Sequence, residues 1–486
     1  MTTASTPRDV TASAIHRLKD WARTDDPGAA NDPKHRVRRA IVWLWRLYAV
    51  VSLLLVVDSL DRLLGPTAEP AFGRHHAADF GGFYTGATIV WRDRASDLGD
   101  IDTQKQVQAE IQAREQTGWK WFNPLPHPPV LSLLTAPIAE LPIRTAYWLW
   151  VLASVAAAGV AAYLLARVLS PAVPIATTII LLCFEPLWHL VWWGQVDAFI
   201  LLPVAAGCAL LLRARSGRDE VAAGLLIGTL ALIPQYAVVP FLALAVARRR
   251  AAAGMAAMGG LLALASVAMV GRDGLAHYVD MVRYFGAFTG TATVTERAMF
   301  NVRGMVLRLG LDLGEQTIIR LVWAIALILA ALTVAAAGRA LRPGRAPDLA
   351  LGLVLLAALL TSYHTHRQTL VFLFVLFAAL VGRSLAPGTH PAVALLWATP
   401  VIGLHAATAI LRREFPISAY PIQTYLAPVC LALLLLLALA LLVPHLARHL
   451  DGWPRVTVAR LPQQKSGDGS VPVGEPRPAV RAVTGS

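Results

Sequence analysis

Apolar segments follow one another along almost the whole chain, and this pattern restricts the folds that the chain can adopt. Of its 486 residues, 56% are hydrophobic and only 15% are charged, whereas soluble domains carry about 25% charged residues. Such segments are stable inside a bilayer as helices, because a helix satisfies its own backbone hydrogen bonds. The sequence therefore predicts an all-α polytopic membrane protein.

Basic residues gather in short clusters between the apolar segments, and the chain carries a formal net charge of +13. Loops rich in Lys and Arg stay on the cytoplasmic side of a membrane. We therefore expect these loops and both termini to face the cytoplasm, and the basic charge requires no nucleic-acid partner. The clusters are Lys34 to Arg39, Arg213 with Arg215, Arg248 to Arg250, and Arg339 with Arg342 and Arg345.

Composition divides the chain into three parts. Residues 1–39 and 451–486 are polar or contain many Pro, Gly and Ser residues, and we predict them to be disordered cytoplasmic ends. Residues 40–450 form the predicted transmembrane domain. Within it, residues 58–123 and 271–315 are the two large polar segments, which we predict to be extracytoplasmic loops.

Apolar runs between residues 40 and 446 are the candidate transmembrane helices. Several are shorter than the roughly 20 residues that a helix needs to cross a bilayer. The Arg-rich loops share one side only if either 124–142 or 172–190 is re-entrant, which predicts about twelve crossings. The other candidate spans are 40–57, 145–166, 196–212, 220–233, 237–247, 255–270, 316–338, 348–361, 368–382, 391–411 and 422–446.

Residues 102–118 form a polar stretch of high helical propensity inside the first outer loop. Its few apolar residues, Val107 and Ile111, lie four positions apart and therefore on one face of a helix. We predict a helix that rests on the membrane surface through this face.

Polar residues inside or beside the apolar segments fall mostly on the predicted outer side. An ionisable residue at a membrane boundary is costly to desolvate and commonly has a function. Because charged residues are scarce in this chain, their gathering from separate segments predicts an outward-facing active site. The residues are Asp79, His127, Glu185, His189, Gln195, Asp197, Gln235, Tyr236, Asn301, Arg303, His364, His366 and Arg367.

Asp79 is the residue of this group that we expect to be catalytic. It begins the Gly-rich stretch from Asp79 to Tyr84, which follows the first long apolar segment. A carboxylate in this position can act as a general base. An Asp is also a common N-cap, so the alternative is that Asp79 caps a helix over residues 83–92.

Several other polar residues have structural interpretations as well. Gln195 and Asp197 can cap the helix that begins at Val196. His364 and His366 would lie on opposite sides of a helix, so we expect no metal site there. They would instead donate hydrogen bonds to phosphate or hydroxyl groups, or be histidines of the membrane interface.

Arg303 and Arg367 are the candidate anion-binding residues. They can bind either a substrate phosphate or lipid headgroups, and the sequence does not separate the two. The chain has no Gly-rich phosphate loop and no stretch long enough for a soluble nucleotide-sugar domain. A sugar transferred on the outer face would therefore come from a donor that is itself in the membrane.

An ordered set of motifs runs from about residue 40 to 446. It begins with Asp79-Phe80 and Phe83-Tyr84. The further elements are Phe122-Asn123-Pro124 with His127-Pro128-Pro129, Ala136-Pro137 to Leu141-Pro142 with Ala146 to Trp150, Gly194-Gln195-Val196-Asp197, Asn301-Val302-Arg303-Gly304, and Tyr363-His364-Thr365-His366. The set resembles glycosyltransferase family 87, in which the first element reads Asp-Phe-x-x-Phe-Tyr.

Two positions depart from the family pattern. Relatives often carry a Lys in the middle segment where this chain has Ile233-Pro234-Gln235, and His-Asp in the late outer loop where it has His366-Arg367. The first departure removes a candidate contact to a donor phosphate, and Arg367 could replace that charge. Both departures concern the donor rather than the fold.

The resemblance implies a GT-C fold of about 12 transmembrane helices, some short or re-entrant, with surface helices in the first outer loop. It implies inverting transfer of a sugar from a polyprenyl-phosphate donor to a glycolipid or cell-wall glycan, on the outer face of the plasma membrane. Mannose is favoured and arabinofuranose is possible. Asp79 would be the general base, without cofactor or metal. Substrate would bind Tyr84, His127, Gln195, Asp197, Gln235, Tyr236, Asn301, Arg303, His364, His366 and Arg367.

Two other classes of function fit parts of this pattern. A transporter or flippase of a lipid-linked or anionic substrate would also use broken helices and intramembrane polar residues. Against it, the two halves of the chain show no visible repeat, and the polar residues gather at one face rather than at the midplane. A non-catalytic scaffold is the third class, and it would be indifferent to the change Asp79→Asn.

Overall fold

The structure is a computed structural model, and it describes residues 33–64, 77, 79–119, 122–286, 299–342, 345–385, 389, 391–413 and 423–443. Over these residues the chain is helical and contains no strand. This agrees with the predicted all-α class. The predicted disordered ends lie outside the described residues, except that helix α2 already begins at Pro33.

Within the described residues, five helices are long and apolar enough to cross a membrane, and a bent pair makes a sixth if it counts as one span. The chain is therefore an integral membrane protein by the length and composition of its helices, while twelve crossings remain a prediction. The five long helices are α2 (Pro33–Leu64), α7 (Ile143–Leu169), α13 (Arg249–Gly286), α15 (Glu315–Ala340) and η7 with α17 (Arg367–Leu373 and Phe374–Leu385).

The bent pair consists of α8 (Pro174–Leu182) and α9 (Glu185–Trp193), which meet at an angle of 51°. Pro186 lies at the start of α9, where its missing N–H costs no helical hydrogen bond. This pair occupies the predicted span 172–190. The other interrupted segment, 124–142, forms only α6 (Val130–Thr135) and η3 (Ala136–Glu140), too short for a full crossing.

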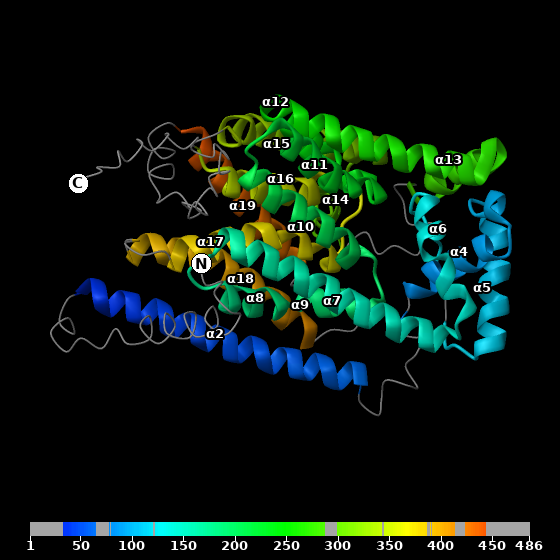
Figure 1. Cartoon of the computed structure of the whole chain (residues 1–486), viewed down its shortest axis with the longest axis horizontal. Coiled ribbons are helices and arrows are strands. Elements are labelled where there is room, and N and C mark those ends of the chain that lie inside the picture. Colours follow the sequence, from blue (N-terminus) through cyan, green and yellow to red (C-terminus); the bar gives the residue numbers. More distant parts are fainter. Residues whose placement is uncertain are drawn as a thin grey trace, which may run out of the picture.

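Shorter helices complete the bundle (Figure 1). Several run end to end, so that η4 continues α11 and α12 follows η5. Their bounds are α10 (Asp197–Arg213), α11 (Gly217–Ile227), η4 (Gly228–Leu232), η5 (Pro234–Tyr236), α12 (Val238–Ala247), α14 (Val302–Arg308), α16 (Pro347–Thr361), α18 (Pro391–Arg413) and α19 (Gln423–Leu442).

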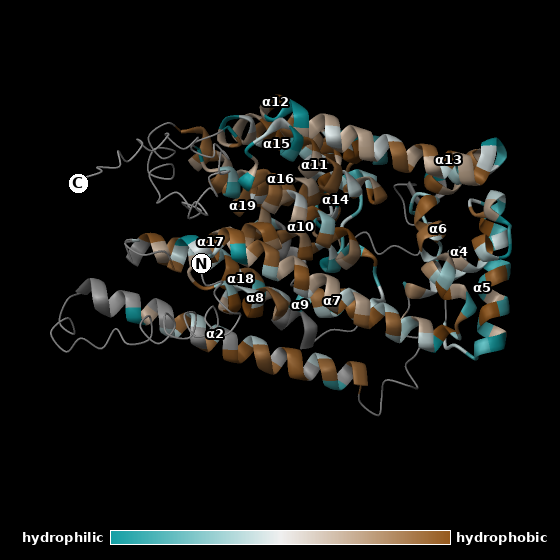
Figure 2. Ribbon diagram, in the orientation of Figure 1, coloured by the Kyte–Doolittle hydropathy of each residue, from teal (hydrophilic) through white to brown (hydrophobic). Residues whose placement is uncertain are grey.

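Helices α16 and α17 lie at the centre of the bundle, and nearly all of their side chains are buried. A helix that is apolar all round lies either in a protein core or in lipid, and here the other helices cover both. Helices α2, α13 and α15 instead expose many large apolar side chains, and the ribbons of α2 and α13 are brown over long stretches in Figure 2. In a bilayer these exposed faces would contact lipid.

A layer of short helices covers one end of the bundle, at the right of Figure 1. It contains α4 (Phe80–Trp91), η2 (Ala95–Asp97), α5 (Ile101–Glu115) and α6. Helix α13 reaches this layer because it continues through a break at Gly271, whose φ is 69°. Part of the predicted outer loop 271–315 is therefore helical.

Helix α5 confirms the predicted helix in the first loop but corrects its placement. Val107 and Ile111 are fully buried within the protein, and α5 packs on α4. We expected Val107 and Ile111 to rest on the membrane, but protein covers them, because α5 packs on the aromatic-rich α4. The opposite face of α5 carries the polar residues that appear teal in Figure 2.

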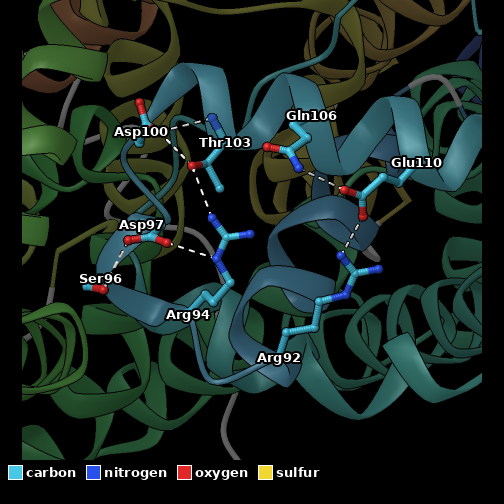
Figure 3. Close-up of polar contacts among 8 residues, drawn as sticks. All are labelled: Arg92, Arg94, Ser96, Asp97, Asp100, Thr103, Gln106 and Glu110. Atoms are coloured by element: carbon cyan, nitrogen blue, oxygen red, sulfur yellow. Dashed lines mark hydrogen bonds and ion pairs between the residues drawn. The ribbon is translucent and has the colours of Figure 1, made fainter.

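Polar contacts join the start of α5 and its exposed face to the end of α4 (Figure 3). Arg92 forms an ion pair with Glu110 at 2.7 Å, and Arg94 pairs with Asp97 at 2.9 Å. Asp100 is the N-cap of α5 and accepts a hydrogen bond from the backbone N–H of Thr103. Exposed ion pairs of this kind each contribute little to the free energy of unfolding. Their effect here is to orient α5 relative to α4.

Candidate active site

Asp79 lies immediately before the first residue of α4, and two side-chain amides hold its carboxylate. Asn123 Nδ2 donates to Asp79 Oδ1 over 3.0 Å, and Gln195 Nε2 donates to Oδ2. Asp79 has helical dihedrals (φ −78°, ψ −28°) and makes no side-chain capping bond to α4. The N-cap alternative is therefore wrong, because the carboxylate points to other segments rather than to its own helix.

Gly194 explains how Gln195 reaches Asp79. Its φ of +74° is a left-handed conformation that favours glycine, and it ends α9. A Cβ at Gly194 would lie 2.6 Å from Cβ of Phe80, so the absence of a side chain lets α9 approach the start of α4. The indole of Trp150 then donates to the carbonyl oxygen of Gln195 over 3.3 Å.

Asn123 is a site residue that the sequence did not assign, although it lies inside a quoted motif. Two buried glutamines of α5 fix the segment that carries it. Gln108 Oε1 accepts from the backbone N–H of Asn123, and Gln104 Oε1 accepts from that of Leu125, both over 3.0 Å. The loop 122–129 has no helix of its own, so α5 supplies its rigidity.

We expect Gln108→Ala and Asn123→Ala to move the acidic limb of the pH–rate profile to higher pH. Burial raises the pKa of the Asp79 carboxyl, and the hydrogen bonds from Asn123 and Gln195 oppose this rise. Losing one of them raises the pKa further, and a general base is active only when ionised. At neutral pH we expect kcat/KM to fall about five- to tenfold, the worth of one hydrogen bond.

Gln106→Ala is the matched control for Gln108→Ala. Gln106 lies on the exposed face of the same helix and donates to Glu110 over 3.0 Å (Figure 3). The control should retain the wild-type profile. A Gln108→Ala enzyme with an unchanged acidic limb would contradict a role of α5 in positioning Asn123.

An aromatic stack lies next to the carboxylate. The ring of Phe83 stacks on His127 with centroids 5.2 Å apart, and on Trp150 at 5.6 Å. His127 is partly exposed, and burial lowers its pKa to about 4. A neutral imidazole here can donate or accept a hydrogen bond, but it brings no positive charge at pH 7.

Tyr84, which we predicted to bind substrate, is buried and makes hydrogen bonds within the protein. Its ring is fully buried, and its hydroxyl donates to the carbonyl oxygen of Leu141 over 2.7 Å. Arg114 donates to the same hydroxyl over 3.3 Å. The residue joins α4 to η3 and does not point to Asp79.

A second carboxylate, Asp197, lies at the start of α10 and interacts electrostatically with Asp79. It is 2% exposed. Asp197 also interacts electrostatically with Tyr236, whose hydroxyl donates to the carbonyl oxygen of His364 over 3.0 Å. Gln235, beside Tyr236, is partly exposed, and none of the contacts described for it reaches Asp79.

His364 and His366 do not lie in a helix, which corrects the premise that they point to opposite sides. The segment 362–366 is an extended loop, and the two rings meet edge to face with centroids 4.4 Å apart. Burial lowers the pKa of both, that of His366 to about 4. His364 also interacts electrostatically with His127 and Arg303.

Asn301 and Arg303 support this loop. Asn301 is fully buried; its side-chain oxygen accepts from Gly304 N–H and its Nδ2 donates to the carbonyl oxygen of Ser362, both over 2.9 Å. Its amide is therefore committed to the protein, in contrast to the predicted contact with substrate. Arg303 is 2% exposed and lies over the ring of Tyr363 at 4.2 Å.

Arg367 lies next to this cluster and contacts α9. Its guanidinium donates to Nδ1 of His189 over 2.7 Å and lies 3.5 Å from the carboxylate of Glu185. Together with the contacts above, the structure brings the predicted outer-side residues other than Gln235 into adjoining groups at one end of the bundle. The described residues contain no group of three or more His, Cys, Asp or Glu side chains arranged to hold a metal ion.

Comparison with models of known protein families gives a match. The family model of glycosyltransferase family 87 matches residues 126–364. The matched region contains His127, Gln195, Asp197, Tyr236 and His364, whereas Asp79 lies before it. No curated protein and no solved structure matches the chain.

Proposed function

Because the chain belongs to glycosyltransferase family 87, we propose that this membrane glycosyltransferase takes its sugar from a polyprenyl-phosphate donor and uses Asp79 as general base. The proposed acceptor is a glycolipid or a cell-wall glycan. Mannose is the favoured sugar, and arabinofuranose is the other candidate. No cofactor and no metal enter the proposed reaction.

The observation that carries this proposal is the arrangement around Asp79. Two neutral amides orient the carboxylate, and no basic side chain is among its described hydrogen-bond partners. Burial raises its pKa, which makes the ionised carboxylate a better proton acceptor. A salt-bridged carboxylate would have the opposite property, since a positive partner lowers its pKa.

In the proposed reaction the acceptor hydroxyl oxygen attacks the anomeric carbon of the donor. Its proton passes to Asp79 while the bond between the anomeric carbon and the phosphate oxygen breaks, so that the configuration inverts. The polyprenyl phosphate leaves with the electron pair of that bond. Arg303 can stabilise the developing charge, and neutral His364 and His366 can donate hydrogen bonds to it.

The proposed topology places Asp79 at the extracytoplasmic face of the plasma membrane and both termini in the cytoplasm. The basic residues at the ends of α10, α12 and α15 lie at the opposite ends of these helices from the Asp79 cluster, as the positive-inside rule requires. Short helices that run end to end, such as α11 with η4, would then complete the roughly twelve crossings.

The experiment that tests this function is sugar transfer by purified full-length protein in lipid nanodiscs. Labelled polyprenyl-phosphate-mannose, its arabinofuranose equivalent and the corresponding nucleotide sugars are each supplied with membrane lipids as acceptor. We expect label in the lipid fraction from one lipid-linked donor and none from a nucleotide sugar. Transfer from the nucleotide sugar alone would contradict the proposed donor.

A further inference from the structure

A pocket beside the Asp79 cluster has a composition that the proposed reaction does not yet use. Glu185, Trp188, His189 and Trp192 of α9 line it together with Arg367. Ser59 and Leu63 of α2 close its other side. The pocket thus combines apolar walls with a few converging polar groups, as small-molecule sites do.

The polar groups of this pocket form a neutral set. The Glu185 and Arg367 side chains, 3% and 16% exposed, face each other at 3.5 Å. Since a guanidinium can only donate, Nδ1 of His189 accepts the 2.7 Å bond from Arg367 and its Nε2 carries the proton. One carboxylate, one guanidinium and a neutral imidazole sum to no net charge.

The absence of a net positive charge makes this pocket unfavourable for a phosphate. A phosphate on Arg367 would place its charges beside the buried carboxylate of Glu185, and like charges in a buried site repel strongly. A neutral ligand that carries hydroxyl groups meets no such penalty, because a carboxylate accepts its hydrogen bonds and a guanidinium donates to it. The large apolar indoles suit the C–H face of a sugar ring.

The segments that line the pocket also lead to the residues around Asp79. The carbonyl oxygen of Trp192 accepts from the N–H of Ala77 over 3.0 Å, two residues before Asp79. Gln195, which donates to Asp79, follows Trp192 by three residues, and Arg367 directly follows His366. The same segments therefore hold the pocket and the cluster.

We propose that this pocket is a subsite for a neutral sugar ring of the acceptor, and not the site of the donor phosphate. This inference rests on the proposed transferase function, and it gives Arg367 a different ligand from the phosphate considered for it from sequence. Trp188 is the pocket residue best suited to a mutational test, because a 2.9 Å hydrogen bond to the carbonyl oxygen of Leu182 fixes the position of its indole.

The test is thermal unfolding of the full-length protein in detergent, titrated with methyl α-mannopyranoside and methyl α-arabinofuranoside. A ligand that binds only the folded state raises the unfolding temperature. We expect one glycoside, at concentrations up to about 50 mM, to raise it above the value in equal sorbitol. Sodium phosphate should give no rise beyond sodium chloride of equal ionic strength.

Two pocket variants and one control sharpen this test. Trp188→Leu should weaken the apparent Kd for the glycoside at least about threefold, through loss of the aromatic wall. Trp323→Leu removes an exposed tryptophan of α15 and should bind as the wild type does. Glu185→Gln should weaken glycoside binding and add a phosphate-dependent rise, because Arg367 then carries an uncompensated charge; a purely structural role of Glu185 predicts no such gain.

The outcomes separate this inference from the proposed function. Stabilisation of the wild type by phosphate, or no rise with either glycoside, would overturn the sugar subsite even if transfer activity is found. Glycoside binding that depends on Trp188, in a protein that transfers no sugar from any donor, would support the subsite and refute the transferase reaction.

Discussion

Asp79→Asn is expected to abolish sugar transfer while the protein still binds its lipid donor. The asparagine keeps the size of the side chain but cannot take the proton of the acceptor hydroxyl. General-base catalysis contributes about 10²- to 10⁴-fold, so we expect kcat to fall about 1,000-fold. Donor binding should change little, because no donor contact is assigned to the carboxylate. Transfer of label and retention of labelled donor, measured on the same preparation, check both parts.

Asp102→Asn is the matched control for this variant. Asp102 lies in the first turn of α5, in the layer of short helices that also contains α4, and its side chain is 87% exposed. The same chemical change there should leave transfer unchanged. If Asp79→Asn retained turnover within about tenfold of wild type, as an orienting role without proton transfer would permit, Asp79 would not be the base.

Gly194→Ala is expected to destabilise the protein and to lower its activity together. An L-residue pays about 1–2 kcal/mol in the left-handed conformation that Gly194 adopts. The new Cβ would lie 2.6 Å from Phe80, and overpacking of this kind costs about 1–3 kcal/mol more. Separating α9 from α4 would also move Gln195 away from Asp79. A lower unfolding temperature in detergent and at least about tenfold slower transfer would report the two effects.

Gly159→Ala makes the same substitution where neither cost applies. Gly159 lies within α7, and a Cβ there would meet nothing within 4 Å. Alanine is the better helix former by about 0.5–1 kcal/mol, so this control should be as stable as the wild type or slightly more so. Equal behaviour of the two variants would contradict the close contact between α9 and α4.

The sequence predicted the fold class and most helices, because apolar length and helical propensity are local properties. The count of crossings could not be tested by length alone, since α16 has only 15 residues and the pair α8 and α9 is bent. The surface placement of α5 was wrong for a related reason. Two apolar residues four apart show that a face is buried, but they do not show whether lipid or protein covers it.

The candidate site was predicted in part. Gln195 proved to contact Asp79 directly, and the outer-side residues do lie at one end of the bundle. Asn123 was not assigned, because an asparagine in a Pro-rich loop carries no signal of its own and is placed by Gln108 from a different helix. Asn301 and Tyr84 donate hydrogen bonds to backbone carbonyl oxygens, which the sequence does not reveal, and their contacts with substrate stay predictions.

The measurement that tests the central claim most directly compares transfer with translocation in proteoliposomes. Labelled polyprenyl-phosphate sugar is placed in one leaflet, and both its covalent incorporation into acceptor lipid and its movement to the other leaflet are followed over time. A transferase with Asp79 as base predicts incorporation that Asp79→Asn abolishes, without faster movement of the donor than in protein-free vesicles. Accelerated movement of intact donor, with no incorporation of its sugar, would show a flippase and contradict this account.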